Sequence, residues 1–567
     1  MKPYILLFIL ISSSSQSQIS SALLKKMETN QKIPVLIQFK QQADLSGINY
    51  NWSKEQKAAY AYQVLNHTSG LSQKKCQELL QSKNISFRSF YLVNALWTEL
   101  TKETILQIAA LEEVDRISYD SPQRGVPQQD PSIHLTQRAP EITWGIKRVG
   151  ADQVWDLGIK GQGIVVAGED TGVRWDVAAI KARYRGNTNG LIDHNYNWHD
   201  AIHQISPLSG NPNNPCGLNL KEPCDDNSHG THTVGTMVGE TAEHAIGMAP
   251  EAQWIGCRNM EQGNGAPSTY IECFEFFLAP YDLDGKNPKP ELAPHVINNS
   301  WYCSLEEGCD TTVFPIMELV VENLRKAGVV VVVSAGNDGA ACNTLRHVPA
   351  IYDGSFSVGA FHPDNHISNF SSNGPVNNYK ATRIKPNVVA PGSDVLSTLP
   401  DGQFASWNGT SMAGPHVAGL VALMISANPL LAGRVETIES IIEETAEPFV
   451  ADFDCFPYSG TRIPNNTYGY GLIDALKAVK KAQLYVGTIE NEATAFQIYP
   501  NPVYDVLQIE ILKGMQTEFV LMDALGKELK RISFNAKQHT ENLSELKPGV
   551  YFIQSVSGTE KRSFVKM

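Results

Sequence analysis

Ser411 stands in a segment suited to nucleophilic chemistry. The sequence NGTSMAGPHVAG predicts the start of a helix there, because Gly409 permits a sharp turn and Pro415 fits only a first helical turn. A hydroxyl at a helix N-terminus lies in a field that favours developing negative charge. It becomes a nucleophile when a base takes its proton and a carboxylate orients that base. The alternative is a serine that only begins a buried helix.

Two other segments supply a candidate base and a candidate carboxylate. His229 begins a run of small residues in the sequence NSHGTHTVGTM, which predicts another helix start. Asp170 ends the run IVVAGED, so its carboxylate is expected at the C-terminal edge of a buried parallel strand, where open α/β sheets place their chemistry. His232 is interpreted as structural, because one base suffices. Glu169 should point to the opposite face of the sheet from Asp170, which argues against a catalytic carboxylate pair.

These segments, in the order Asp, His and Ser, resemble the subtilisin-like serine proteases, or subtilases. The resemblance runs from about Trp144 to about Ala482, and among subgroups it is greatest to the bacillopeptidase F type. It implies a three-layer α/β sandwich with a mostly parallel sheet. Further matching segments are AP at 249–250, INNS at 297–300, the run 329–339, NFSSNGP at 369–375, APG at 390–392 and YGYGLIDA at 468–475.

The resemblance also implies a role for each candidate residue. Ser411 would attack the scissile carbonyl, His229 would accept and return the proton, and Asp170 would hold the imidazole in its useful tautomer. Asn337 would donate its side-chain amide to the tetrahedral oxyanion, together with the backbone N–H of Ser411. The alternative for Asn337 is an asparagine that merely tolerates a turn.

Two segments are expected to bind the substrate backbone. By the same resemblance they flank the primary specificity pocket, and extended substrates would bind there by adding a strand. Their residues are Ser300, Ser334, Ala335 and Gly336. Where relatives more often carry small or aliphatic residues, the chain continues after Ser300 with Trp301, Tyr302 and Cys303. The side chain that the pocket accepts therefore stays open.

Composition fits an extracellular enzyme of several domains. The 567 residues exceed what one hydrophobic core holds and suggest three or four units. The formal net charge of −13 argues against binding to nucleic acids or to anionic membranes. Lys2 and the apolar run from Tyr4 to Ile11 predict a signal peptide over residues 1–20, with a buried first strand as the alternative.

A different pattern precedes the subtilase-like region. Residues 32–120 show the order β-α-β-β-α-β, which predicts a small ferredoxin-like domain similar to the inhibitory propeptides of this protease class. Such a domain would chaperone the peptidase domain and block its cleft until removed; a non-inhibitory adaptor is the alternative. Residues 121–140, rich in Pro, Gln and Arg, are interpreted as the linker cut on maturation, and the peptidase domain is expected over 141–483.

The C-terminal part predicts a small β-sandwich. After a linker at 484–494, residues 495–567 carry short alternating strands separated by glycine and proline turns. YPNP at 499–502, GVY at 549–551 and the basic ending resemble the C-terminal sorting domain of type IX secretion substrates. This implies passage through outer-membrane secretion machinery to a secreted or cell-surface location. A substrate-binding accessory module is the alternative.

Nine cysteines in an exported chain predict disulfides. Cys76 falls in the expected propeptide, and the other eight allow four bridges whose connectivity the sequence leaves open. Cys216 with Cys224, and Cys303 with Cys309, would each close a short loop. Zinc is the competing interpretation, but no C-x-x-C or histidine-rich spacing supports it.

No cofactor is required by the predicted chemistry. Many relatives bind calcium in a loop after the histidine helix, but the segment 239–247 is short, so that site should be absent. Asp225 and Asp226 could coordinate a cation, yet a solvated turn explains them equally well.

Together these features predict a secreted serine endopeptidase made as an autoprocessed zymogen. It would hydrolyse peptide bonds of proteins or peptides through an Asp-His-Ser triad and an acyl-enzyme intermediate, with its own propeptide as inhibitor. The other function class is a catalytically silent surface binding protein on a subtilase scaffold, since a fold does not fix function. Loss of a triad residue would favour that class, and none is missing.

Overall fold

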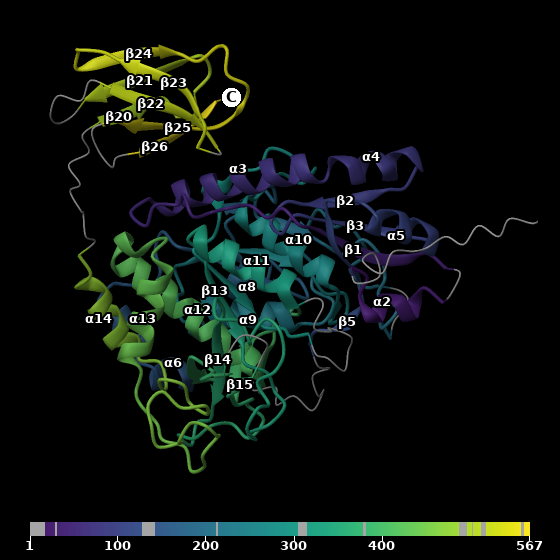
Figure 1. Cartoon of the computed structure of the whole chain (residues 1–567). Coiled ribbons are helices and arrows are strands. Elements are labelled where there is room, and N and C mark those ends of the chain that lie inside the picture. Colours follow the sequence, from purple (N-terminus) through teal and green to yellow (C-terminus); the bar gives the residue numbers. More distant parts are fainter. Residues whose placement is uncertain are drawn as a thin grey trace, which may run out of the picture. The chain divides into compact units, whose positions relative to one another are not determined.

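A sheet of seven strands lies at the centre of the larger of two units in the computed structural model (Figure 1). The structure describes residues 18–28, 31–126, 142–210, 214–303, 314–377, 382–486, 496–501, 503–511, 518–524, 526–556 and 561–566. The strand order is β17-β14-β13-β12-β6-β10-β9, and every neighbouring pair is parallel. The strands are β6 (Val165–Asp170), β9 (Trp198–Asp200), β10 (Gln253–Arg258), β12 (Val296–Asn299), β13 (Val330–Ser334), β14 (Phe356–Phe361) and β17 (Val388–Pro391).

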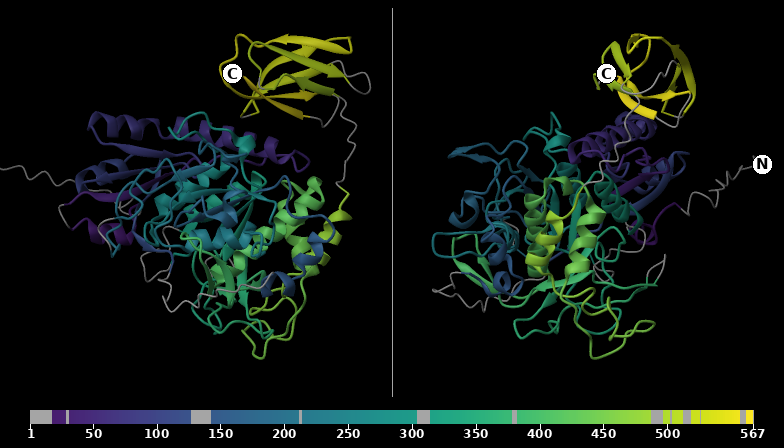
Figure 2. Two further views of the ribbon diagram at one scale, coloured as in Figure 1. Left: turned by 180° about the vertical axis from the view of Figure 1, so that it is seen from behind. Right: turned by 90° about the vertical axis from the view of Figure 1, so that its left-hand side faces the viewer.

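Helices cover both faces of this sheet, which explains why its strands are so rich in valine. β13 reads VVVVS, and all five residues are buried. One face packs against α9 (His229–Val238) and α12 (Thr410–Ala427), and the other against α10 (Pro267–Leu278) and α11 (Phe314–Lys326) (Figure 2). The predicted three-layer α/β sandwich with a mostly parallel sheet is confirmed.

The helix α12 carries Ser411 and is the core helix of one layer. Among the residues that the structure describes, it is the one helix long and apolar enough to cross a bilayer, and 89% of that window is buried inside the protein. It packs against α9 and against strands β12, β13, β14 and β17. The apolar composition of α12 is therefore explained by burial in the protein core.

The N-terminal elements form a second, smaller sheet of order β2-β3-β1-β4 with antiparallel pairing. Its strands are β1 (Ile33–Phe39), β2 (Phe87–Phe90), β3 (Ala95–Leu100) and β4 (Val114–Tyr119). The helices are α2 (Ser21–Lys26), α3 (Lys54–Ser72), α4 (Lys74–Ser82) and α5 (Lys102–Ala109). The predicted strands and helices are present, with α4 as an additional helix between β1 and β2. Most of the predicted signal peptide lies outside the described residues.

This N-terminal sheet and α3 pack against α10 and α11 (Figures 1 and 2). Glu275 of α10 accepts a hydrogen bond from Leu92 N at 2.6 Å, and Asn323 of α11 donates to Leu92 O at 2.8 Å. The Lys54 ammonium is buried and donates to Ala293 O at 2.6 Å; its burial lowers the pKa of Lys54. All described residues up to Tyr485 form one compact unit.

A charged cluster lies in the same contact. The Arg88 guanidinium of β2 pairs with Glu272 Oε2 of α10 at 2.6 Å. The other carboxylate oxygen, Oε1, lies 2.8 Å from the Nε2 atoms of both His199 and His203. Burial by itself raises the pKa of Glu272, but the hydrogen bonds with the two histidines and the charge of Arg88 outweigh it and lower the pKa.

The C-terminal unit is a β-sandwich of two antiparallel sheets around its own small core. One sheet has the order β20-β21-β24 and the other β23-β22-β25-β26. The strands are β20 (Phe496–Tyr499), β21 (Val506–Ile511), β22 (Glu518–Asp523), β23 (Glu528–Ser533), β24 (Gln538–Asn542), β25 (Gly549–Ser555) and β26 (Lys561–Lys566). The predicted sandwich is confirmed, and β23 and β24 are strands that the sequence pattern did not reveal.

Disulfides connect parts of the first unit. A bridge joins Cys216 to Cys224, which is one of the two predicted pairs. Two further bridges join Cys257 to Cys273 and Cys342 to Cys455. Cys303 is also disulfide-bonded, while Cys309, its predicted partner, lies outside the described residues. Cys76 is a buried free thiol, and burial raises its pKa to about 12.

Candidate active site

The Asp170 carboxylate and the His229 imidazole form a buried pair. Asp170 is the last residue of β6 and His229 the first residue of α9, and they are 1% and 0% exposed. His229 Nδ1 lies 2.8 Å from Asp170 Oδ1 and 2.9 Å from Oδ2. Asp170 Oδ1 also accepts a hydrogen bond from Thr171 N at 2.7 Å. The carboxylate thus fixes a proton on Nδ1 and leaves Nε2 as the basic nitrogen.

The close approach of α9 to β6 depends on the glycine that follows His229. A Cβ atom on Gly230 would lie 2.0 Å from Gly172 O and 3.0 Å from Asp170 Cβ. Any side chain there would push α9 away from the strand and pull the imidazole off the carboxylate. The sequence His-Gly is therefore a steric requirement for the pair.

Asp225 holds the start of α9 in place, and sequence reasoning assigned it no such role. Its Oδ1 accepts hydrogen bonds from Ser228 N at 2.8 Å and Thr171 Oγ1 at 2.9 Å, and its Oδ2 accepts from Thr231 N at 2.9 Å. It thereby caps the helix and connects it to the residue beside Asp170. These contacts engage Asp225 within the protein and not in a solvated turn. Neighbouring Asp226 pairs with the buried Arg258.

The Ser411 hydroxyl lies at the second residue of α12, but it is hydrogen-bonded away from the histidine. Ser411 Oγ donates to Ser300 O at 3.0 Å, and Ser300 Oγ donates to Ser411 O at 2.8 Å. His229 Nε2 is buried and has no hydrogen-bond partner among the described residues. The structure therefore joins Asp170 to His229 as predicted. The Ser411 hydroxyl is instead hydrogen-bonded to the carbonyl of Ser300, the residue that follows β12.

Asn337 is fixed by the residue that precedes the serine. Thr410 donates from its backbone N and from its hydroxyl to Asn337 Oδ1, both at 2.9 Å. The same hydroxyl accepts a hydrogen bond from Gly336 N at 3.2 Å. Because its oxygen is engaged, Asn337 keeps its amide NH₂ free to donate elsewhere. Thr410 is a positioning residue that sequence reasoning missed, although it lies inside the serine motif.

The segment expected to bind substrate, 334–336, is largely engaged within the protein. Ala335 N donates to Val358 O at 3.0 Å, and Gly336 O accepts from Ser372 N at 3.0 Å. Ser334 is buried at the end of β13, and its hydroxyl has no hydrogen-bond partner among the described residues. Substrate pairing along this segment stays a prediction.

Glu169 and His232 do not take part in the hydrogen-bonded pair of Asp170 and His229. Glu169 accepts a hydrogen bond from Asn259 Nδ2 at 2.7 Å, and burial raises its pKa well above the ordinary value. His232 stacks on Trp407 with ring centroids 4.4 Å apart, and its Nε2 lies 3.1 Å from Ala405 O. Burial lowers the pKa of His232 to about 3, so it stays neutral. These contacts agree with a structural role for both residues.

Comparison with family models decides the family of the chain. Residues 161–471 match the model of the subtilase family, which is more than half of the chain. The chain belongs to the subtilase family. Residues 497–567 match the secretion system C-terminal sorting domain, which marks this subtilase for export to a secreted or cell-surface location.

Individual relatives of this subtilase are serine proteases. It is 32% identical to bacillopeptidase F of Bacillus subtilis (strain 168) over 85% of its own length and 34% of that protein. The chain thus spans about a third of that relative. It is 31% identical to an intracellular serine protease of Paenibacillus polymyxa over 52% of the chain and 75% of that protein. Subtilisin E of Bacillus subtilis is 28% identical over 53% of the chain and 68% of its own length.

A short segment of this subtilase pairs with another part of its own chain near the candidate nucleophile. β5 (Gln123–Arg124) pairs antiparallel with β11 (Asn264–Gly265), although it falls in the predicted linker. Beyond β5, Gly125 N donates to Gly263 O at 3.0 Å and Gly125 O accepts from Tyr302 N at 3.2 Å. Tyr302 lies two residues after Ser300, whose carbonyl holds the Ser411 hydroxyl. The segment 123–126 is thus bound as an added strand beside the candidate nucleophile.

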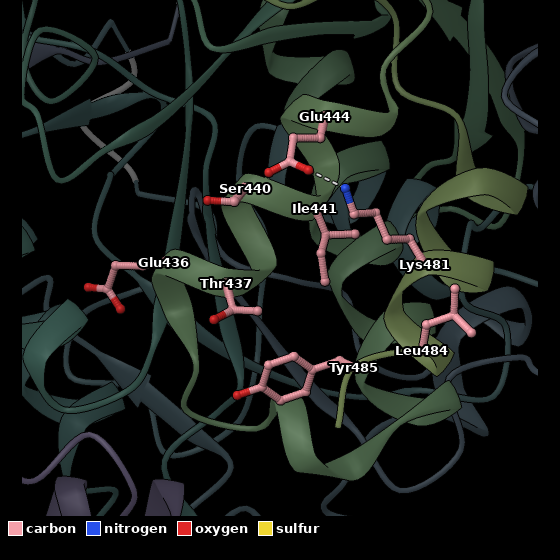
Figure 3. A pocket seen from close by; sticks show the side chains of 8 residues that line it. All are labelled: Glu436, Thr437, Ser440, Ile441, Glu444, Lys481, Leu484 and Tyr485. Carbon is pink, nitrogen blue, oxygen red and sulfur yellow. Dashed lines mark hydrogen bonds and ion pairs between the residues drawn. The ribbon is translucent and has the colours of Figure 1, made fainter. Parts of the chain in front are cut away.

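A hollow of about 480 Å³ lies elsewhere, between α13 (Val435–Thr445) and α14 (Ala475–Gln483) (Figure 3). The Lys481–Glu444 ion pair lies at one side of it and Tyr485 at the other. It contains none of the candidate catalytic residues, so the chemistry is assigned to the α9–α12 site instead.

One group of side chains has the composition of a metal site. His362, Asp364 and His366 form a turn after β14, and their ligand atoms lie within 4.8 Å of one another. They lie on the surface, and no residue of the Asp170–His229 pair belongs to the group. The chemistry of the candidate active site needs no metal ion.

Proposed function

We propose that this subtilase is a secreted serine endopeptidase, with Ser411 as nucleophile, His229 as general base and acid, and Asp170 as the group that orients the imidazole. The observation that carries the proposal is the pair of hydrogen bonds between Asp170 and His229 Nδ1, which leaves Nε2 to accept a proton. Ser411 would attack the peptide carbonyl, and His229 would pass the proton to the leaving amine. Water would then hydrolyse the acyl-enzyme by the same route.

The oxyanion would be stabilised by two donors, the NH₂ of Asn337 and the backbone N–H of Ser411. The Thr410 hydrogen bonds support this role, because they fix the amide before substrate arrives. The reaction requires the Ser411 hydroxyl to leave Ser300 O and rotate toward His229 Nε2. Hydrogen bonds of catalytic residues often form fully only once substrate is bound.

The chain would be made as a zymogen. The segment 123–126 supports this, because it is bound as an added strand next to Tyr302 and follows β4 of the N-terminal sheet. Asp120 strengthens the attachment: it accepts hydrogen bonds from Ser268 N at 3.0 Å and Ser268 Oγ at 2.6 Å at the start of α10. The N-terminal elements would inhibit the peptidase until the chain is cut within residues 127–140, and proteins or peptides would then be its substrates.

Export would use a type IX secretion system, with the sandwich 495–567 as its signal. The family match at 497–567 supports an export role, and the motif YPNP at 499–502 supports this particular system. Fusion of 495–567 to a periplasmic reporter in a type IX-competent bacterium should move the reporter to the medium or cell surface. Retention of the fusion in the periplasm would instead favour an accessory binding module.

Turnover of casein by the processed protein, together with labelling by a fluorophosphonate, tests the catalytic proposal. Ser411→Ala should abolish both signals and leave the chain uncut. Ser426→Ala is the matched control, because this serine lies at the exposed end of the same helix and donates to Gln162 O. A processed sample that neither labels nor cleaves casein would favour the catalytically silent binding protein.

A further inference from the structure

Gly125 is the residue of the bound segment that is hydrogen-bonded on two sides. Its N–H donates to Gly263 O at 3.0 Å and its carbonyl accepts from Tyr302 N at 3.2 Å, so main-chain bonds hold it between these two residues. Gly125 is buried, whereas the preceding Arg124 is exposed. Val126, which follows, is 2% exposed and belongs to the hydrophobic core around α10.

A side chain at Gly125 would require its neighbours to shift. A Cβ atom there would lie 2.7 Å from Met260 Sδ and 2.8 Å from the Tyr270 hydroxyl oxygen, with Trp301 Cβ at 3.6 Å. Carbon atoms do not approach other heavy atoms so closely without displacing them. The backbone φ of Gly125 lies outside the left-handed region, so space alone, not conformation, excludes a side chain.

The residues around Gly125 have little freedom to move away. Tyr270 stacks on Trp301 with ring centroids 3.8 Å apart and an interplanar angle of 9°. On another side it meets Gly265, where a Cβ atom would lie 2.7 Å from the Tyr270 hydroxyl oxygen. Met260 and Trp301 are 0% exposed and Tyr270 is 1% exposed. A larger residue in this position would therefore overpack a closed wall.

We infer that this subsite selects glycine, and that Met260, Tyr270 and Trp301 are its specificity-determining residues. The inference rests on the proposed function, because the bound segment then marks the path of a substrate N-terminal to the cut bond. The substrate position in register with Arg124 tolerates any residue, since it faces solvent. The position in register with Val126 favours an apolar residue. The preferred substrate class is an extended peptide with glycine followed by an apolar side chain.

Peptides with the sequence of residues 120–130 test the inference with the processed enzyme. Each peptide is measured as a substrate and as a competitor of casein hydrolysis. Replacing the glycine in register with Gly125 by alanine should weaken use of the peptide about 10-fold, and leucine should weaken it about 100-fold or more. Leucine in register with Arg124 is the matched control and should change use of the peptide less than about 3-fold.

Opening the wall should remove the selection. In a Met260→Ala, Tyr270→Phe double variant, the alanine peptide should approach the glycine peptide in rate. Casein turnover by the wild-type enzyme with equal use of the glycine and leucine peptides would overturn the inference and leave the proposed function intact. Absence of casein turnover by the processed wild-type protein would instead overturn the proposed function.

The full chain provides a readout that needs no catalysis. In a Ser411→Ala background, Gly125→Leu should displace the segment, so that Tyr302 N–H loses Gly125 O as its acceptor and exchanges its hydrogen at least about 10-fold faster. Arg124→Leu in the same background should leave that exchange rate unchanged. Equal protection of Tyr302 N–H in the Gly125→Leu and parent chains would show that the subsite admits a side chain, which contradicts the inference.

Discussion

Thr410 holds Asn337 by two hydrogen bonds of 2.9 Å, one from its backbone N–H and one from its hydroxyl. Thr410 directly precedes Ser411, so one short stretch of backbone positions both the proposed nucleophile and Asn337, the side chain proposed to stabilise the oxyanion. The hydroxyl also accepts a hydrogen bond from Gly336 N, which connects α12 to the end of β13. The site is thus preorganised by a neutral side chain that never needs to touch the substrate.

Asn337→Ala should lower kcat by about 10²–10³-fold and change KM little, because the lost donor acts on charge that exists only in the transition state. Steady-state kinetics with a chromogenic peptide would measure both constants. Fluorophosphonate labelling is the control for an intact nucleophile. A rise in KM with unchanged kcat would mean that Asn337 binds substrate without stabilising the oxyanion.

Thr410→Val should lower kcat by about 10- to 100-fold, because Asn337 then loses the hydroxyl that holds its amide. Thr410→Ser keeps the hydroxyl and should retain most of the activity. The comparison separates positioning from simple packing, since valine preserves the shape of threonine and serine does not. Equal activity of the valine and threonine enzymes would remove Thr410 from the site.

Asp225→Ala should destabilise the start of α9 by about 0.5–2 kcal/mol and also lower kcat, because the helix carries His229 on its first residue. Unfolding by urea and steady-state kinetics on the same samples would measure the two effects. Asp176→Ala is the control: this carboxylate pairs with Arg174 near the surface, at 2.6 Å, and should affect neither quantity strongly. Wild-type kcat in Asp225→Ala would show that the cap is not needed to place the imidazole.

Sequence patterns were sufficient for the elements whose residues are buried. A sheet that is covered on both faces explains the valine-rich run at β13, the acid at the end of β6 and the apolar helix α12. In these elements the residue types therefore indicate where the residues lie in the fold. In β21 of the sandwich, Leu507 and Ile509 are buried and alternate with less buried residues, as the strand pattern predicts. In each case the hydrophobic pattern is the cause of the fold.

Contacts made by backbone or by polar side chains could not be predicted in this way. β5 and β11 are two residues each and bind through main-chain groups, so no apolar pattern marks them. β23 and β24 are mostly exposed and polar, which hides their strand character. The bond from Thr171 to Asp225 and the bonds from Thr410 to Asn337 join residues that are distant in sequence. The hydrogen bond from the Ser411 hydroxyl to Ser300 O depends on a rotamer that no pattern encodes.

Removal of the bridge between Cys342 and Cys455 should destabilise the first unit more than removal of the Cys216–Cys224 bridge. The former connects residues 113 positions apart and the latter residues only 8 apart. A longer closed loop restricts the unfolded chain more. The Cys342→Ser, Cys455→Ser double variant should therefore lose about 2–5 kcal/mol of unfolding free energy. Urea unfolding of both variants in a Ser411→Ala background would compare them without self-digestion. Equal losses would contradict the loop-length argument.

His203 should make the contact between the N-terminal sheet and α10 depend on pH. It faces Glu272 at 2.8 Å, with His199 on the same carboxylate oxygen and Arg88 on the other. Burial alone lowers the pKa of His203, but the Glu272 hydrogen bond and charge outweigh it, so the pKa is raised above 6.5. A raised pKa means that folding stabilises the protonated form of His203, because this form interacts with Glu272 in the folded chain. The resulting stability is complete below pH 6.5 and is lost as pH rises through the folded-state pKa.

His203→Gln keeps a hydrogen-bonding side chain but removes this titration. In a Ser411→Ala background, the variant should therefore lose more apparent thermal stability against its parent at about pH 5.5 than at about pH 8.5. His67→Gln is the control variant, because this histidine of α3 lies outside the Glu272 cluster. A His203→Gln loss that is constant with pH would mean that the imidazole acts in this contact only as a neutral hydrogen-bonding group.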